Sequence, residues 1–132
     1  MRFVDTNVFI YKAIRSPQND YEISGRILKR IENGEQVVTS LPVIQEVVKW
    51  FEYNNRKKEI GSFLQAINSY LTMDKVPVEW DAFLPSLEEM SKKQISFVDS
   101  LNLQIMKQHG IDEIYSNDRD FDRIEWVKRI WE

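Results

Sequence analysis

The sequence has 132 residues, of which 42% are hydrophobic, so it is long enough and apolar enough for one folded domain and is not typical of a disordered chain. It contains no cysteine and only one histidine, which excludes disulfides, thiolate zinc sites, thiol nucleophiles and histidine-rich metal sites. Acidic residues outnumber basic ones by 21 to 18, which argues against a broad basic surface for nucleic acid but not against a local one.

No apolar stretch approaches the ~20 residues that a membrane-spanning helix requires. The sequence opens directly on a predicted strand and shows no apolar signal region. We therefore expect a single domain over residues 1–132 that works in the cytoplasm without a membrane partner.

The N-terminal segment is predicted to hold a short strand followed by a helix over residues 7–14. Phe3 and Val4 are typical of a buried strand, and Thr6 or Asn7 is expected to cap the helix with its side-chain oxygen. This places Asp5 at the carboxyl end of the first strand, where ligands bind in open α/β sheets. A solvated turn acid or a helix cap is the alternative interpretation of Asp5.

The next predicted elements are a helix over 21–33, a strand over 36–39 and a helix that begins near Leu41. Proline is well tolerated in a first helical turn, so Pro42 fits this start. Glu46 lies at the edge of the apolar stripe of that helix, which is formed by Val43, Ile44, Val47, Trp50 and Phe51. The alternative is a boundary glutamate whose stem packs while its carboxylate reaches water.

The middle of the chain begins with the basic cluster Arg56–Lys58, which is either a solvated helix face or an RNA contact. A helix is predicted over 59–71, with Leu64 and Leu71 among its buried residues. Residues 76–78 are expected to form an edge or bent strand, because they contain a proline. A further helix is predicted over 80–91, where Pro85 can introduce a bend.

The last third is predicted to contain a helix that ends near His109, a strand over 114–116 and a short edge strand over 127–131. Asp99 follows Ser96 by three residues, which is the spacing of a capping box, so capping and chemistry are both open for this acid. The segment 117–122 carries three acids. It is not an EF-hand loop, because it lacks a glycine at the sixth position and an acid at the twelfth.

Strands that alternate with helices predict an α/β fold with a mostly parallel sheet covered by helices. In that fold Asp5 and Asp118 follow strands, while Glu46 and Asp99 lie in first helical turns, so all four can face one cleft. Close carboxylates repel one another unless a cation intervenes. Oxygen ligands without cysteine or a histidine cluster favour a hard ion, Mg²⁺ or Mn²⁺.

The chemistry that suits such a cleft is metal-assisted displacement at phosphorus. A divalent ion lowers the pKa of a coordinated water, orients the phosphate and stabilises the leaving oxygen. The carboxylate pattern therefore indicates hydrolysis of a phosphodiester.

The sequence resembles the PIN-domain ribonucleases, and within them the VapC-type toxins of prokaryotic toxin–antitoxin pairs. The matching segments sample the whole chain in the order of the family: Val4–Asn7, Val43–Val47, Ser96–Ser100 and Ser116–Phe121. This resemblance implies a three-layer α/β/α sandwich, cleavage of RNA that depends on Mg²⁺ or Mn²⁺, a homodimer, and inhibition by an antitoxin protein that reaches into the cleft.

The resemblance also assigns roles to single residues. Asp5 and Asp99 are implied as direct metal ligands, whereas Glu46 and Asp118 bind through water or orient the nucleophile. Asp120 is a candidate fifth acid. Asn7 and Ser116 match polar positions that can hydrogen-bond the acids or a phosphate of the substrate. Arg119 is a further candidate for substrate binding.

RNA approach is expected to depend on basic side chains around the cleft, because phosphate contacts carry most non-specific affinity. The candidates are Arg56, Lys57, Lys58, Lys92, Lys93 and Arg119.

Two other functions remain open from the residues alone. An aspartyl-phosphate phosphatase would use Asp5 as its nucleophile, but such enzymes have a second aspartate two residues later, where this chain has Asn7. The other alternative is an RNA- or protein-binding module of the same fold without catalysis.

Overall fold

The structure is a computed structural model that describes all 132 residues. Its centre is a five-stranded sheet in which every neighbouring pair is parallel, in the order β3-β2-β1-β4-β5. The strands are β1 (Arg2–Val4), β2 (Val37–Ser40), β3 (Met73–Val76), β4 (Glu113–Tyr115) and β5 (Lys128–Ile130). The predicted parallel sheet is confirmed.

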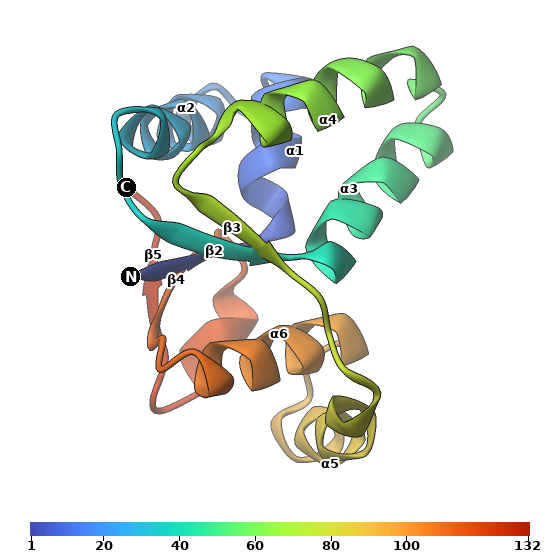
Figure 1. The fold of residues 1–132 in the computed structure, drawn as a ribbon, viewed down its shortest axis with the longest axis vertical. Coiled ribbons are helices and arrows are strands. Elements are labelled where there is room, and N and C mark those ends of the chain that lie inside the picture. The colour runs from blue at the N-terminus through green and yellow to red at the C-terminus, as the bar shows by residue number, and fades with distance from the viewer.

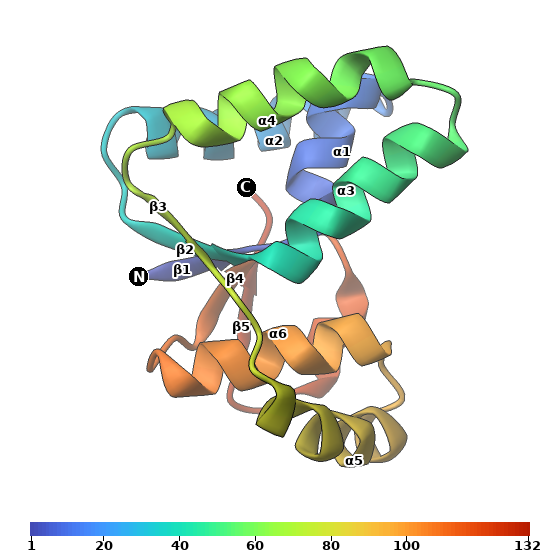
Figure 2. The same ribbon diagram turned by 45° about the vertical axis from the view of Figure 1, so that its right-hand side comes forward.

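Helices cover both faces of the sheet and produce the predicted three layers (Figures 1 and 2). One face carries α1 (Thr6–Ile14), α2 (Gln18–Glu32), α3 (Leu41–Tyr53) and α4 (Ile60–Ser69). The other carries α5 (Phe83–Lys93) and α6 (Phe97–Gln108). Three short 3₁₀ helices complete the chain: η1 (Lys57–Glu59), η2 (Trp80–Ala82) and η3 (Arg119–Arg123).

The first strand occupies the middle of the sheet because its residues are apolar on both sides. Phe3 and Val4 are fully buried, and β1 pairs with β2 on one side and with β4 on the other. The chain builds the sheet outward from β1 to β3 and then crosses to its other side at β4. This change of direction creates a switch point beside the carboxyl end of β1, where parallel sheets bind ligands.

Two predictions about helices are wrong: the N-cap of the first helix and the bend at Pro85. The N-cap of α1 is Asp5 itself, whose side chain accepts a hydrogen bond from the Thr6 backbone N–H, and not Thr6 or Asn7. Pro85 lies in the first turn of α5, after η2, so it does not bend the middle of a helix over 80–91. Proline fits a first turn because the N–H that it lacks would be free there.

The helix predicted over 59–71 is shorter, and two of its expected core residues are exposed. The chain forms η1 and then α4, which ends at Ser69. Leu71 is 94% exposed because it lies past the helix in the turn to β3, and Leu64 is 44% exposed. The apolar spacing predicted burial, but α4 is the outermost helix on its face, so only the Ile67 side is fully covered.

The two predicted edge strands do lie at the edges of the sheet, as β3 and β5. The bounds predicted for the first were wrong, because β3 is Met73–Val76 and ends before Pro77, which has no N–H to donate to a neighbouring strand. None of the helices is long and apolar enough to span a membrane.

Candidate active site

Five acidic side chains line one cleft of about 320 Å³ at the carboxyl edge of the sheet: Asp5, Glu46, Asp99, Asp118 and Asp120. Thr6, Asn7, Ile10 and Ser96 complete the lining. The structure therefore brings together all four acids that the sequence singled out, together with the candidate fifth acid. They come from the end of β1, from α3, from α6 and from the segment after β4 that leads into η3, because each of these begins or ends at the same edge.

Asp5 is held in one position by the elements on both sides of it. The residue is 4% exposed, and its carboxylate accepts hydrogen bonds from the Thr6 backbone N–H at 2.8 Å and from the Ser116 hydroxyl at 2.7 Å. Its own backbone N–H donates to the Tyr115 carbonyl at 3.1 Å, which continues the β1–β4 ladder. The Asp5 carboxylate is thus oriented before any ligand arrives.

Ser116 connects three parts of the site through one hydroxyl. It donates to Asp5 and accepts from the Asn7 side-chain amide at 3.2 Å and the Asp118 backbone N–H at 3.0 Å. These three bonds use the full capacity of a hydroxyl group, and the side chain is fully buried. Ser116 therefore orients the acids from beneath and is not accessible to a substrate.

Asn7 and Asn117 fix the loop that carries Asp118. The Asn7 side-chain oxygen accepts from the Asn117 backbone N–H at 3.1 Å, and the Asn117 amide donates to the Tyr11 hydroxyl at 3.0 Å. Asp118 then caps η3 by accepting from the Asp120 backbone N–H at 2.9 Å. Sequence reasoning missed Asn117, although its place between a strand end and two acids was a usable signal.

Asp99 enters the cleft from the first turn of α6. The Ser96 hydroxyl accepts from the Asp99 backbone N–H at 3.1 Å, which is one half of the predicted capping box. This bond uses the backbone of Asp99, and the carboxylate lines the cleft beside Asp5 and Asp118. Capping and chemistry are therefore compatible at this position.

The electrostatics of the cleft favour a cation. Burial and, after it, the charges of Asp5 and Asp118 together raise the pKa of Asp99 to about 8. Burial likewise raises the pKa of Asp5 to about 6, against the opposing hydrogen bonds from Ser116 and Thr6. Glu46 adds repulsion at both carboxyls. Asp99 therefore holds a proton at neutral pH and Asp5 holds one only below about pH 6, and no positive side chain lowers the pKa of either carboxyl group.

The donor set fits a hard divalent ion, since it consists of carboxylate, hydroxyl and amide oxygens and includes no histidine or cysteine. No three acids are already arranged as a ligand set. Like charges push the carboxylates apart, so a bound cation would draw them together.

Two of the sequence-predicted residues play a smaller part in the cleft. Asp120 lines it but also forms an ion pair with Arg123 at 3.3 Å, which offsets part of its charge. Arg119 is exposed on η3 and does not line the cleft.

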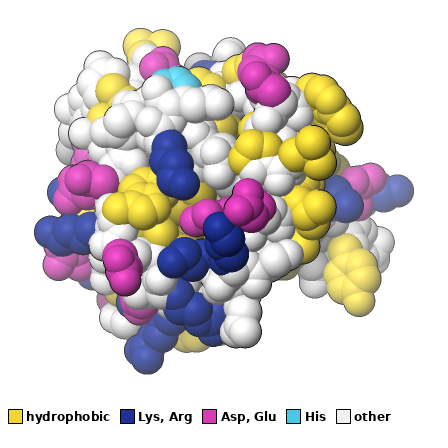
Figure 3. Space-filling model, turned by 90° about the horizontal axis from the view of Figure 1, so that it is seen from below, with side chains coloured by type: hydrophobic (Ala, Val, Ile, Leu, Met, Phe, Trp, Pro, Cys, Tyr) yellow, Lys and Arg dark blue, Asp and Glu magenta, His cyan; other side chains and the backbone are white.

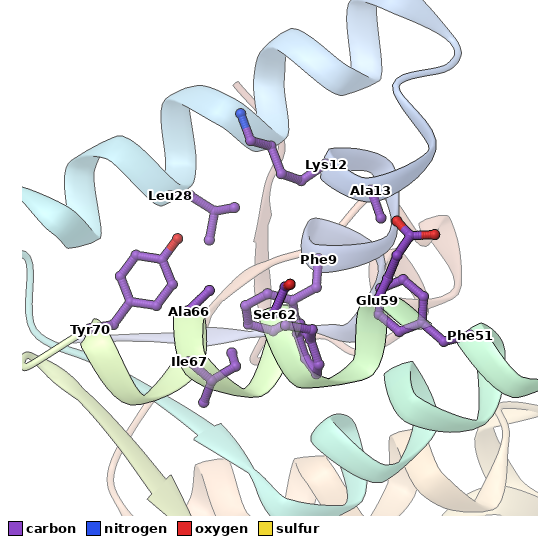
Figure 4. A pocket seen from close by; sticks show the side chains of 11 residues that line it. Phe9, Lys12, Ala13, Leu28, Phe51, Glu59, Ser62, Ala66, Ile67 and Tyr70 are labelled. Carbon is purple, nitrogen blue, oxygen red and sulfur yellow. The ribbon is translucent and has the colours of Figure 1, made fainter. Parts of the chain in front are cut away.

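A second hollow, of about 360 Å³, lies between α1, α2 and α4 (Figure 4). Its walls are mainly hydrocarbon, including Phe9, Leu28 and Ile67, and Glu59 is the one acid among them. It offers no group of acids that could share an ion or activate water. The acidic cleft is therefore the candidate active site.

Comparison with known proteins agrees with this geometry. The PIN-domain profile matches residues 2–127. The chain is similar to the VapC ribonuclease Mb1869c of Mycobacterium bovis and to ribonuclease VapC13 of Mycobacterium tuberculosis. Each is 25% identical over 131 residues, covering 98% of this chain and 99% of the relative.

Solved structures share the fold. Mycobacterium tuberculosis VapC20, a toxin that cleaves the sarcin–ricin loop, has a TM-score of 0.77 at 20% identity, covering 96% of this chain and 97% of that chain. The VapBC2 complex of Rickettsia felis, bound to a DNA fragment from its promoter, gives 0.72 at 17% identity, covering 99% and 98%. A toxin–antitoxin complex from Klebsiella pneumoniae gives 0.66 at 16% identity, covering 97% and 96%.

Proposed function

Because the chain belongs to the PIN-domain family, we propose that it is a metal-dependent endoribonuclease and the toxin of a VapBC-type pair. The observation that carries the proposal is the convergence of Asp5, Glu46, Asp99 and Asp118 on one cleft. The two relatives that align over almost the whole chain are named VapC ribonucleases, which supports the same activity here.

The acids divide into two groups by their surroundings. Asp5 and Asp99 are the more enclosed, and we assign them as the direct ligands of Mg²⁺ or Mn²⁺. Glu46 is exposed and lies at the mouth of the cleft, so it suits a role in orienting the attacking water, and Asp118 binds the ion through water. A bound ion would supply Lewis acidity and charge stabilisation at the scissile phosphate.

The test is cleavage of a single-stranded RNA with Mn²⁺ and with EDTA. The wild type is expected to cleave only with the metal, and Asp5→Asn is expected to lose at least about a hundredfold in rate while keeping its far-UV circular dichroism. Asp112→Asn, an exposed aspartate at the opposite edge of the sheet, is the matched control. A wild type that binds RNA equally in EDTA and never cleaves it would instead be a binding module.

An antitoxin partner follows from the same assignment, because two of the solved structures that share the fold are toxin–antitoxin complexes. The acidic cleft would accept a basic or amidated side chain of that partner in place of the metal. Adding Mn²⁺ should therefore weaken the complex, and Asp99→Asn should reduce this competition between the metal and the antitoxin.

We further propose that residues 1–132 act as one domain in the cytoplasm.

A homodimer is proposed through the outer face of η2 and α5. Trp80, Leu84 and Leu87 are 80%, 76% and 50% exposed, which is unusual for large apolar side chains so close together. Figure 3 views the molecule from the layer that contains α5, and hydrophobic side chains gather on one side of this view. Leu84→Asp should halve the mass measured by light scattering, whereas Leu71→Asp, an exposed leucine on the other layer, should not.

A further inference from the structure

A third hollow, of about 380 Å³, adjoins the acidic cleft and shares Glu46 with it. It lies between α3, the start of α5 and the start of α6. Phe83, Phe97 and Val78 form apolar walls, while Gln45 and Lys49 provide polar groups. We name it the side hollow.

Helix geometry explains why the cleft and the side hollow are neighbours. In the first turn of α6, Ser96 and Asp99 line the cleft, whereas Phe97 and Val98 line the side hollow. On α3, Lys49 follows Glu46 by three residues and therefore lies on the same side, one turn further from the sheet. A polymer bound at Asp99 can thus extend into the side hollow.

The aromatic walls of the side hollow are fixed by their neighbours. The Phe83 ring packs edge-to-face on Phe97 at 5.4 Å between centroids and is stacked on Trp80 at 5.1 Å. Because Phe83 contacts a ring on each side, Phe83 and Phe97 present a well-held apolar surface to the hollow. A rigid aromatic wall is what a flat heteroaromatic ring needs for stacking, since little side-chain freedom is lost on binding.

The charge distribution points to a nucleotide as the occupant. No lysine or arginine lines the acidic cleft, so the cleft by itself repels an RNA phosphate. Lys49 is exposed, forms no ion pair and borders the side hollow. It can neutralise a phosphate next to the one being cleaved, while the Gln45 amide offers both a donor and an acceptor to a base edge.

We propose that the side hollow binds one unpaired base of the RNA substrate, with the ring against Phe97 and Phe83, the base edge at Gln45 and the adjoining phosphate at Lys49. This inference rests on the proposed function, because it places the base next to the cleaved phosphate. It favours RNA with at least one unpaired nucleotide beside the cleavage site, since a paired base must first lose its pairing and stacking before it can enter the hollow.

The test measures binding without cleavage, by fluorescence anisotropy in EDTA with the full chain. The probes are a labelled single-stranded 12-nucleotide RNA of mixed sequence and copies with an abasic residue at each position in turn. Gln45→Ala and Phe97→Ala should each raise Kd roughly tenfold. Lys49→Ala should lower the slope of log K against log salt by about 0.7. Gln65→Ala, an exposed glutamine on α4, is the matched control.

The abasic series identifies the bound base. One abasic position should weaken binding to the wild type about as much as Phe97→Ala does, with no further loss when both changes are combined. Phe97→Tyr, which keeps an aromatic ring, should bind the RNA about as tightly as the wild type does. Gln45 is an exposed helix residue, so Gln45→Ala keeps the test valid even where Phe97→Ala fails to fold.

Two results would overturn the inference. The first is that no abasic position changes the Kd of the wild type and that Gln45→Ala also leaves Kd unchanged. The second is a halved mass in light scattering for Gln45→Ala or Lys49→Ala, which would assign the side hollow to a second copy of the chain. A wild type that shows the abasic effect but does not cleave RNA with Mn²⁺ would contradict the proposed nuclease and leave the base site standing.

Discussion

Asp5 shows how one residue serves both the fold and the site. The carboxylate that caps α1 also lines the cleft, and it is buried at the end of a strand with like charges nearby. Hydrogen bonds from Thr6 and Ser116 offset part of the cost of burying this charge. The sequence offered capping and chemistry as alternatives, and the structure combines them.

The raised pKa values predict how stability depends on pH. The folded-state pKa values of Asp5 and Asp99 are about 6 and about 8, against 3.8 as the ordinary value, so the folded protein holds protons that the unfolded chain has released. Their contribution to stability is complete below the unfolded pKa and is lost as the pH rises through the folded values. In EDTA, Tm should therefore fall between pH 5 and pH 9.

Asp99→Asn should remove most of this fall and raise Tm at pH 8.5 in EDTA by about 3 °C or more. Asp74→Asn, an exposed aspartate on β3, should leave the profile unchanged. Mn²⁺ should stabilise the wild type more at pH 8.5 than at pH 5, because deprotonated carboxylates bind the ion. An identical Tm for wild type and Asp99→Asn at every pH would contradict the repulsion described here.

Ser116 gives a second prediction at the residue scale. Ser116→Ala removes the only side-chain donor to Asp5 and leaves a buried carboxylate oxygen without a partner. The expected cost is about 2 kcal/mol in the free energy of unfolding at pH 8, measured with urea, and a smaller cost at pH 5, where Asp5 is protonated. Ser91→Ala, at an exposed serine of α5, should cost far less. Equal costs for the two variants would exclude an orienting role for Ser116.

At the scale of elements, a buried hydrogen bond ties α3 to α6 and so sets how Glu46 and Asp99 face each other. The Ser40 hydroxyl accepts from the Val43 backbone N–H at 3.1 Å as the N-cap of α3. It also donates to the Asn102 side-chain oxygen at 2.7 Å, and both side chains are fully buried. The two helices that supply cleft acids are therefore not independent.

Ser40→Ala is expected to cost about 2 kcal/mol in the free energy of unfolding, because it removes a helix cap and a buried bond together. Ser96→Ala removes only the exposed cap of α6 and should cost about 1 kcal/mol. Urea unfolding measures both. A double-mutant cycle between Ser40→Ala and Asn102→Ala should show coupling, and strictly additive losses would mean that the two side chains act separately.

For the whole molecule, the basic cluster at residues 56–58 lies beyond the C-terminal end of α3, at the tip that α3 and α4 form together (Figure 1). Arg56 is committed to the fold, since it forms an ion pair with Glu59, donates to the Ala13 carbonyl at 3.1 Å and packs over Trp50. Lys57 and Lys58 are exposed and remain available to RNA.

Replacing Lys57 and Lys58 together with alanine should weaken RNA binding and reduce the salt slope by about 1.4, because each phosphate contact to a single strand contributes about 0.7. Arg26 and Lys29, exposed on α2, provide a control pair with the same change of net charge. The measurement is the Kd of each variant at four salt concentrations, which also gives the salt slope. An unchanged Kd and slope would remove this cluster from the RNA path.

The sequence by itself determined the alternation of strands and helices, the parallel sheet and the acids at strand ends and helix starts. These features follow from local periodicity, caps and turns, which act between residues close in the chain. Even the four cleft acids were identifiable, because parallel strands place their carboxyl ends at one edge.

Only the tertiary structure decided which apolar residues are covered and which polar groups meet. Leu64 and Leu71 have core-like spacing but remain exposed, since burial depends on what packs against a helix. The Ser116 network, the Ser40–Asn102 bond and the side hollow join residues from distant parts of the chain. Such contacts depend on distances that no local pattern encodes.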